Sequence, residues 1–409
     1  MKTILCLSIN VLLVLTACYS VESPVKTGLD RVEQYRDQFA GKRLGIITNH
    51  TGYNRQGRHI LDVFMEMQQT RITAIFGPEH GIRGDRDAGA VIDHQKENQI
   101  PVYSLYGETH KPTPQMLEEV DVLIFDIQDV GVRFYTYIWT MALAMEAAAE
   151  QGIPFIVLDR PNPINGNDVE GNILEAAFAT FVGLYPIPVR HGMTVGELAR
   201  LFNGEGWLAG GVRADLTVIA MEGWQRGQWF DQTGLTFLAP SPNMPDLETA
   251  SIYPGLCLLE GTNLSEGRGT YQPFLQFGAP WIDKALLAAE LNQLHLPGVR
   301  FEAHEFTPVS IPGMSTNPKY KDVLCYGAKI IVTDRNELKP YWTGIKLVEK
   351  IYQLYPDKLE FRASHFDRLC GTTKIRETIL AKQSLEQLRT IFQADEERFA
   401  TLREKYLLY

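Results

Sequence analysis

The chain has 409 residues, a formal net charge of −10, and 45% hydrophobic and 22% charged residues. This composition is typical of a globular protein long enough for two domains, and it argues against a disordered or fibrous chain. An acidic chain lacks the basic surface that neutralises phosphates, so we expect no nucleic-acid partner.

The N-terminus has the pattern of a bacterial lipoprotein signal. An apolar stretch at 4–14 is too short to span a bilayer, and small residues then lead to Cys18. We predict a signal peptide over residues 1–17, cleavage before Cys18, lipidation of that cysteine, and a polar tether over 18–27. The alternative is an ordinary cleaved signal peptide with an incidental cysteine.

A lipid anchor implies an exported protein on the periplasmic side of a membrane, held there without a spanning helix. The two residues after Cys18 do not form the aspartate signal associated with retention in the inner membrane. This absence favours the outer membrane. The sequence leaves the oligomeric state open.

Short apolar runs alternate with helical stretches in the first half. The runs show no in–out alternation, which is typical of strands buried on both faces. Expected strands lie at 43–48, 72–76, 122–125 and 154–158, and expected helices lie at 59–68, 114–120, 137–150 and 195–202. This order predicts an α/β fold with a Rossmann-like, doubly wound, mainly parallel sheet. No GxGxxG or Walker A sequence follows a strand, so no nucleotide cofactor is expected.

A stretch rich in proline and glycine at 239–255 predicts the passage to a second domain. We therefore divide the chain into a Rossmann-like domain at 28–246 and a smaller α+β domain at 247–409. The second domain is expected to cap or complete the site. Its expected helices lie at 283–294, 339–354 and 385–408, and its expected strands lie near 301–304 and 328–332.

Each expected strand of the first domain ends in polar, ionisable residues. Ligands of doubly wound sheets bind outside the carboxyl ends of the strands, so we expect these ends to converge on one site. The strongest candidate is Glu79, which glycines and a proline flank closely. A general acid needs a carboxyl that is held rigidly and partly withdrawn from water. The alternative is that Glu79 only pairs with Arg83.

Asp126 follows the next central strand and is the best candidate for a second carboxylate, with Gln128 on the same side. The alternative role of Asp126 is to cap the helix that contains Tyr137, and we weigh the two roles evenly. Tyr137 lines a sugar subsite or belongs to the core. His191 precedes a helix with a capping box, and a lone histidine of this kind is more often a hydrogen-bonded loop residue than a catalyst.

The stretch at 260–270 is dense in glycines and polar residues, so it is not expected in the core. It is either a mobile surface loop or a second wall of the site, in which Asn263, Glu266 and Arg268 contact the substrate.

Metal binding has little support. A site would need His50, His80 and His191 with Asp126 and Asp159, but no HxH or HExxH spacing occurs. Cys257, Cys325 and Cys370 are far apart and odd in number, which indicates neither a disulfide framework nor a zinc cluster. We predict no metal and no cofactor. The absence of GxSxG argues against a standard serine hydrolase.

Six motifs then carry a resemblance that covers nearly the whole chain after Cys18. GPEHGIRG, FDIQDVGVRFYTY, LDRPNPING, HGMTVGELA, SPNMP and YPGLCLLEGTNLSEGRGT, in this order, resemble the NamZ-type exo-β-N-acetylmuramidases. The resemblance implies an exo-acting glycosidase that releases N-acetylmuramic acid from the non-reducing ends of peptidoglycan fragments. It also implies a site in the cleft between two domains, with Glu79 as the catalytic acid.

The implied substrate carries a lactyl carboxylate, which Arg83, Arg133 or Arg268 would bind. The second catalytic group is Asp126, Glu266 or the acetamido oxygen of the substrate itself. Further substrate contacts are expected from seven polar residues of the motifs and strand ends: Asn49, His80, Gln128, Asn162, His191, Asn243 and Asn263. Two alternatives remain: a metal-assisted hydrolase of another cell-wall bond, and a non-catalytic lipoprotein that binds muropeptides.

Overall fold

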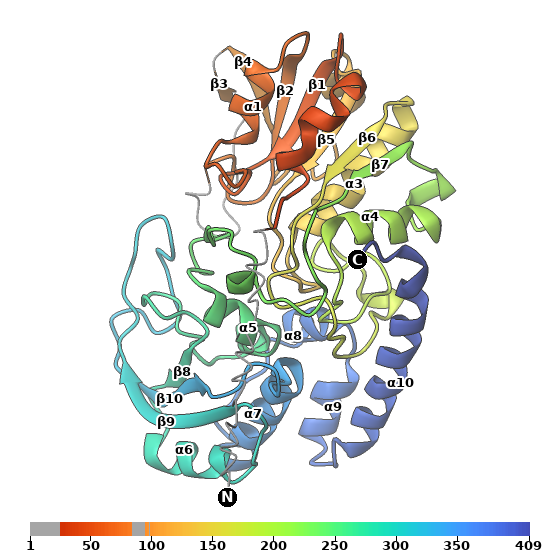
Figure 1. Cartoon of the computed structure of the whole chain (residues 1–409). Coiled ribbons are helices and arrows are strands. Elements are labelled where there is room, and N and C mark those ends of the chain that lie inside the picture. The colour runs from red at the N-terminus through yellow and green to blue at the C-terminus, as the bar shows by residue number, and fades with distance from the viewer. Residues whose placement is uncertain (1–24, 84–94, 98) are drawn as a thin grey trace, which may run out of the picture.

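The computed structural model describes residues 25–83, 95–97 and 99–409. The predicted signal peptide, Cys18 and most of the predicted tether lie outside this range. Figure 1 shows the sheet of the first domain at the top, above a second, smaller sheet with its own helices.

The first domain is built on one seven-stranded sheet with the order β3-β4-β2-β1-β5-β6-β7. Every pairing in it is parallel except that of β3 with β4. The predicted doubly wound, mainly parallel sheet is therefore confirmed. Its strands are β1 (Arg43–Thr48), β2 (Arg71–Gly77), β3 (Gln95–Glu97), β4 (Ile100–Ser104), β5 (Val122–Asp126), β6 (Phe155–Leu158) and β7 (Leu216–Ile219).

Helices cover both faces of this sheet. One face packs on the 3₁₀ helix η1 (Leu29–Gln38) and on α1 (Ile60–Glu66) in a separate apolar cluster. The other face packs on α2 (Pro114–Leu117), α3 (Tyr137–Gln151) and α4 (Val195–Gly204). The core on this second face continues into the second domain, so the two domains are joined by buried apolar contacts.

The second domain contains an antiparallel sheet with the order β8-β10-β9, formed by β8 (Gln276–Ala279), β9 (Val299–Phe306) and β10 (Cys325–Val332). Its first helices are α5 (Leu247–Leu256), α6 (Lys284–Asn292) and α7 (Pro340–Leu354). The stretch at 239–255 is only partly the irregular passage that we expected. Its second half forms the buried helix α5, which accommodates Pro254.

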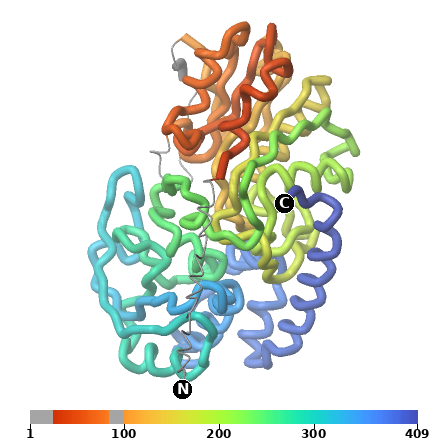
Figure 2. The backbone as a smooth tube through the Cα atoms, viewed as in Figure 1, coloured from red at the N-terminus to blue at the C-terminus, as the bar shows by residue number. Residues whose placement is uncertain are grey.

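Three further helices close the chain: α8 (Ala363–Cys370), α9 (Lys374–Leu380) and α10 (Glu386–Arg403). The expected helix at 385–408 ends earlier, because a 3₁₀ turn η6 (Glu404–Tyr406) follows α10. Shorter 3₁₀ turns are η2 (Ala176–Phe178), η3 (Ala209–Gly211), η4 (Phe230–Gln232) and η5 (Cys257–Gly261). Figure 2 shows the blue C-terminal segment returning to the first domain, where η6 packs on α4.

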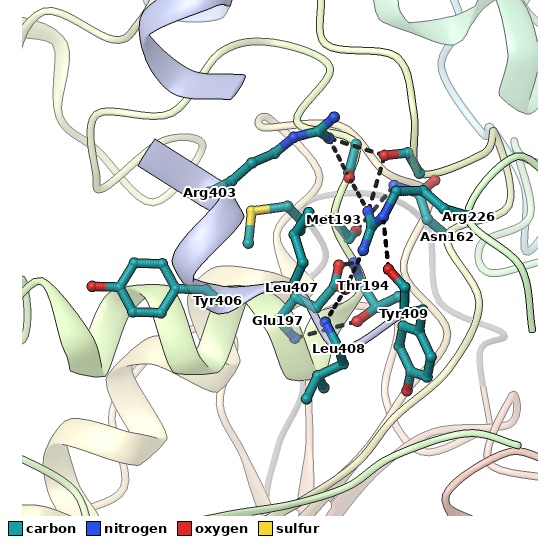
Figure 3. A network of polar contacts seen from close by, with 12 residues as sticks. Asn162, Met193, Thr194, Glu197, Arg226, Arg403, Tyr406, Leu407, Leu408 and Tyr409 are labelled. Atoms are coloured by element: carbon teal, nitrogen blue, oxygen red, sulfur yellow. Dashed lines mark hydrogen bonds and ion pairs between the residues drawn. The ribbon is translucent and has the colours of Figure 1, made fainter. Parts of the chain in front are cut away.

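Arg403 joins this C-terminal segment to loops of the first domain through hydrogen bonds (Figure 3). Its guanidinium is buried and donates to the carbonyl oxygens of Gly166, Asn167 and Gly192 at 2.9, 2.7 and 2.6 Å. Burial lowers the pKa of Arg403 to about 10, so the group stays charged at neutral pH. The final residues add bonds of their own, among them Tyr409 Oη to Asp159 Oδ2 at 2.7 Å.

We expect Arg403→Met to lower the free energy of unfolding by about 2–4 kcal/mol, because it removes the donor of Asn167 O and leaves Gly166 O and Gly192 O with Arg226 as their remaining side-chain donor. Lys405→Met is the matched control. Lys405 lies in the same segment, but its side chain is largely exposed and 3.6 Å from Glu205. Urea unfolding of both variants checks this prediction, and equal small effects would contradict it.

In the described part of the chain, no helix is long and apolar enough to cross a membrane. Cys257, Cys325 and Cys370 are buried and form no disulfides.

Candidate active site

A cavity of about 290 Å³ lies between the two domains and contains Glu79. The first domain contributes the residues after β2 and β4 and the start of α3. The second domain contributes residues of α5, η5 and α8. The polar and aromatic lining residues are Glu79, His80, Tyr106, His110, Phe134, Tyr135, Thr136, Tyr137, Thr180, Phe181, Ser241, Asn243, Tyr253, Glu260, Arg268, Phe274, His365 and Arg368.

Glu79 is presented on a tight turn directly after β2. The amide of Gly81 donates to the carbonyl of Pro78 at 3.0 Å, and His80 has a φ of 68°, in the left-handed region that few side chains adopt. The Thr136 hydroxyl donates to Glu79 Oε2 at 2.8 Å. Thr136 stands immediately before α3, so the carboxylate of Glu79 lies near the positive end of a 15-residue helix.

Aromatic rings form another part of the wall. His110 stacks on Phe181 with ring centroids 3.9 Å apart, and Tyr106 lies 5.5 Å from His110. Burial and the nearby charge of Glu79 raise the pKa of Tyr106, so its hydroxyl stays protonated at physiological pH. Flat, partly apolar rings with polar edges are suited to a sugar.

Two buried polar atoms of the wall make no hydrogen bond of ordinary geometry with any described residue. One is the hydroxyl of Tyr135, which lies near Ser241, and the other is Oδ1 of Asn243. The amide nitrogen of Asn243 is occupied, since it donates to Met314 O at 2.6 Å. An unpaired buried donor or acceptor costs about 1–3 kcal/mol, so a ligand that pairs with both atoms recovers this free energy.

A polar row crosses the wall contributed by the second domain. Arg268 Nη2 donates to Glu260 Oε1 at 2.7 Å, and His365 Nε2 lies 3.8 Å from Glu260 Oε2. Burial alone would raise the pKa of Glu260, but Arg268 and His365 lower it to about 2. Glu260 is therefore ionised throughout the physiological range.

The structure brings five of the predicted site residues to this cavity: Glu79, His80, Tyr137, Asn243 and Arg268. The hydroxyl of Tyr137 donates to Pro240 O at 2.6 Å, so this residue also belongs to the supporting structure.

Asp126 does not line the cavity. Its side chain is fully buried, and Arg160 contacts both carboxylate oxygens, with Nη2 2.8 Å from Oδ2. Neither predicted role fits these contacts, since Asp126 neither faces the cavity nor caps α3. It is one half of a buried ion pair.

Arg133 is also withdrawn from the cavity. Its Nη1 donates to the carbonyls of Asn172 and Ile187, and its Nη2 donates to those of Leu369 and Cys370. The side chain is fully buried, and burial lowers its pKa to about 10. It joins the first domain to α8 and cannot reach a lactyl group.

The loop at 260–270 is mostly buried, contrary to expectation. Glu266 lies 3.5 Å from Arg268 and 3.0 Å from Lys319, and it does not line the cavity. Asn263 bonds Lys358 O and the amide of Glu360 on a different surface.

The remaining predicted residues of the first domain support its loops. Gln128 donates to Asp129 O and Pro161 O, each at 2.8 Å. Asn49 accepts from the amide and hydroxyl of Thr51. None of these side chains lines the cavity that contains Glu79.

Asn162, His191 and Arg83 also lie away from it. Asn162 donates to Met193 O at 3.0 Å. His191 is fully buried, with Nδ1 accepting from the Met193 amide and Nε2 3.7 Å from Asp129 Oδ2. Arg83 lines a separate cavity beside α1.

A larger cavity of about 460 Å³ lies at the ends of β1, β5 and β6. It is lined in part by His50, Gln128 and Arg160, but no described lining residue is an aspartate or glutamate. Of these two cavities, only the smaller has carboxyl groups among its described lining residues, Glu79 and Glu260. Among the described residues, no group of three or more His, Cys, Asp or Glu side chains could hold a metal ion.

Several lining residues were missed from the sequence, namely Glu260, His365, Arg368, Tyr106, His110, Phe181 and Thr136. Glu260 stands within a quoted motif, and Thr136 lies in the FYTY sequence. The others carry no local signal, because only the packing of α8 and the loops brings them to the cavity.

Comparisons with known proteins cover both domains. A family model described as exo-β-N-acetylmuramidase NamZ, N-terminal, matches residues 44–248, and its C-terminal counterpart matches residues 251–409. The chain is 50% identical over 389 residues to a protein of Bacillus subtilis (strain 168) named peptidoglycan β-N-acetylmuramidase NamZ, covering 94% of this chain and 91% of that one.

Two crystal structures of DUF1343 family proteins from Bacteroides fragilis NCTC 9343 share the fold. The first has a TM-score of 0.87 and 38% identity, covering 94% of this chain and 99% of that chain. The second has a TM-score of 0.77 and 34% identity, covering 95% and 99%.

Proposed function

The chain belongs to the exo-β-N-acetylmuramidase NamZ family of glycosidases, and we propose that it releases N-acetylmuramic acid from the non-reducing ends of peptidoglycan fragments, with Glu79 as the general acid. The observation that carries the assignment of the acid is the position of Glu79. Its half-buried carboxyl lies in the cavity between the domains, next to Thr136 and Tyr106. Protonated, it would donate to the glycosidic oxygen as the bond breaks.

The second catalytic group of this proposal is the acetamido oxygen of the substrate. Asp126 is paired with Arg160, and Glu266 lies outside the cavity lining. Glu260 does line the cavity, but its ion pair with Arg268 and its pKa of about 2 make it a weak nucleophile. Substrate assistance is an established route for glycosidases that act on N-acetylated sugars.

The wall offers what an acetamido group needs in order to be held for attack. Its carbonyl oxygen requires a donor, and its N–H requires an acceptor. The Tyr135 hydroxyl and Asn243 Oδ1 supply one of each, and neither has another partner of ordinary geometry among the described residues. Burial raises the pKa of Tyr135, which keeps its hydroxyl a donor.

The test is incubation of a soluble form beginning at Tyr19 with the disaccharide in which N-acetylmuramic acid is linked β-1,4 to N-acetylglucosamine. We expect release of both monosaccharides at the same rate with and without EDTA. Loss of activity in EDTA would favour a metal-assisted hydrolase. Saturable binding without release would favour a muropeptide-binding lipoprotein.

The N-terminal pattern supports a further proposal, that the protein is exported and anchored by lipidated Cys18 on the periplasmic side of the outer membrane. We expect Cys18→Ser to move the protein from the membrane fraction to the soluble periplasmic fraction while preserving its activity. Fractionation of cells that express each form checks this. A variant that still sediments with outer membranes would contradict lipid anchoring.

A further inference from the structure

N-acetylmuramic acid differs from N-acetylglucosamine by a lactyl ether, whose carboxylate is ionised at neutral pH. If the proposed muramidase function holds, this carboxylate must be accommodated in the cavity. A guanidinium without a carboxylate partner is the side chain best suited to bind it, because it offers two parallel N–H donors.

Arg268 is poorly available for this contact. Its Nε and Nη2 both donate to Glu260 Oε1, at 3.2 and 2.7 Å, and Nε lies 3.5 Å from Glu266. The guanidinium also lies over the ring of Phe274, 5.3 Å from its centroid. Its positive charge is already matched by two carboxylates.

Arg368, in the last turn of α8, is the other arginine of the described lining. Its Nε donates to Ser364 O at 3.1 Å, and its Nη2 lies 3.5 Å from His365 Nδ1. No carboxylate of the described residues lies within ion-pair distance of it, and the side chain is exposed. Nη1 therefore remains available, together with a second N–H of Nη2.

The position of Arg368 is set by the close packing of α8 on η5. A Cβ at Gly261 would lie 2.5 Å from the Cα of Phe366, so only glycine permits this approach. The contact brings His365 beside Glu260, and Arg368 follows as the end of the polar row. Its guanidinium is thus partly oriented before a ligand arrives, which lowers the entropy lost on binding.

We propose that Arg368 binds the lactyl carboxylate of the substrate and is the residue that selects muramic acid over glucosamine. Glu79 comes from the first domain and Arg368 from the second. The reacting sugar would contact both, with its glycosidic oxygen at Glu79 and its lactyl group at α8.

The experiment pairs a charge change on the enzyme with one on the substrate. The substrates are para-nitrophenyl β-N-acetylmuramide and its lactyl methyl ester, which keeps the shape of the group but removes its charge. For the wild type, we expect kcat/KM to be about 10–100-fold higher for the acid, the range of one charge-assisted contact. For Arg368→Gln, kcat/KM for the acid should fall by this factor, while kcat/KM for the ester should stay unchanged. Arg368→Lys should retain part of the preference for the acid.

Arg362→Gln is the matched control, because it removes the same charge beside the same helix at a residue that does not line the cavity. It should keep the wild-type preference. Equal losses of Arg368→Gln on both substrates would overturn the proposal in favour of a structural role, and an unchanged rate on the acid would overturn it outright. A wild type inactive on both substrates would instead refute the muramidase function on which the proposal rests.

Discussion

Replacement of Glu79 by Gln is expected to lower kcat about 10²–10⁴-fold, the range that proton transfer by one positioned side chain contributes. The amide keeps the shape of the carboxyl and can still accept from Thr136, so the fold should be preserved. The loss should depend on the leaving group. The loss of kcat should be near the upper end of this range when the leaving group is β-1,4-linked N-acetylglucosamine, because this group departs as an alkoxide unless it is protonated. The loss should be much smaller when the leaving group is para-nitrophenolate.

This leaving-group dependence distinguishes a general acid from a group that only binds the sugar. Steady-state kinetics on the disaccharide and on the nitrophenyl glycoside measure it directly. Glu108→Gln is the control, because Glu108 is an exposed glutamate that follows β4 but does not line the cavity. An equal loss on both substrates would contradict the acid role, as would wild-type activity on the disaccharide.

The sequence predicted the sheet well because its strands are buried on both faces. Short, continuous apolar runs such as 43–48 and 154–158 are typical of strands buried on both faces, and each of them forms a strand. The edge strands β3 and β7 and the strand β4, which lies next to β3, were missed. The strands β4 and β7 are only partly buried. Their residues are neither buried continuously nor buried at every second position, so neither of the two usual strand patterns applies to them.

The site was predictable only where one loop carries the chemistry. Glu79 stands on a turn whose glycines are local to it, so its place in the cavity could be expected. The rule that strand ends converge does not say which polar groups bind each other. Asp126 and Arg160 are 34 positions apart and satisfy one another, and Arg133 is occupied by carbonyls up to 237 positions away.

The wall from the second domain was the least predictable part. His365 and Arg368 belong to a helix that was not expected, and they reach the cavity because η5 packs closely against α8. That contact depends on tertiary packing, which no local pattern encodes. Glu266 and Arg268 share a motif, yet one is buried away from the cavity and the other lines it.

The buried pair of Asp126 and Arg160 leads to the second large effect. We expect Arg160→Met to lower the free energy of unfolding by about 3–5 kcal/mol, because it leaves a fully buried carboxylate without its counter-charge. Asp126→Asn should have a similar effect, because it leaves the buried guanidinium of Arg160 without its counter-charge. Urea unfolding measures both, with Lys26→Met as the control. Lys26 belongs to an exposed pair with Glu222, and its loss should cost less than about 1 kcal/mol.

The double variant Asp126→Leu/Arg160→Met separates a structural from a catalytic role. Replacing a buried pair by apolar side chains is often neutral, so the double variant should be more stable than either single variant. If Asp126 only stabilises the fold, the refolded double variant keeps the wild-type kcat on a β-N-acetylmuramide. A stable double variant with kcat reduced by a factor of 100 or more would show that Asp126 takes part in catalysis. A residue that only stabilises the fold is not expected to lower the kcat of the folded enzyme by so much.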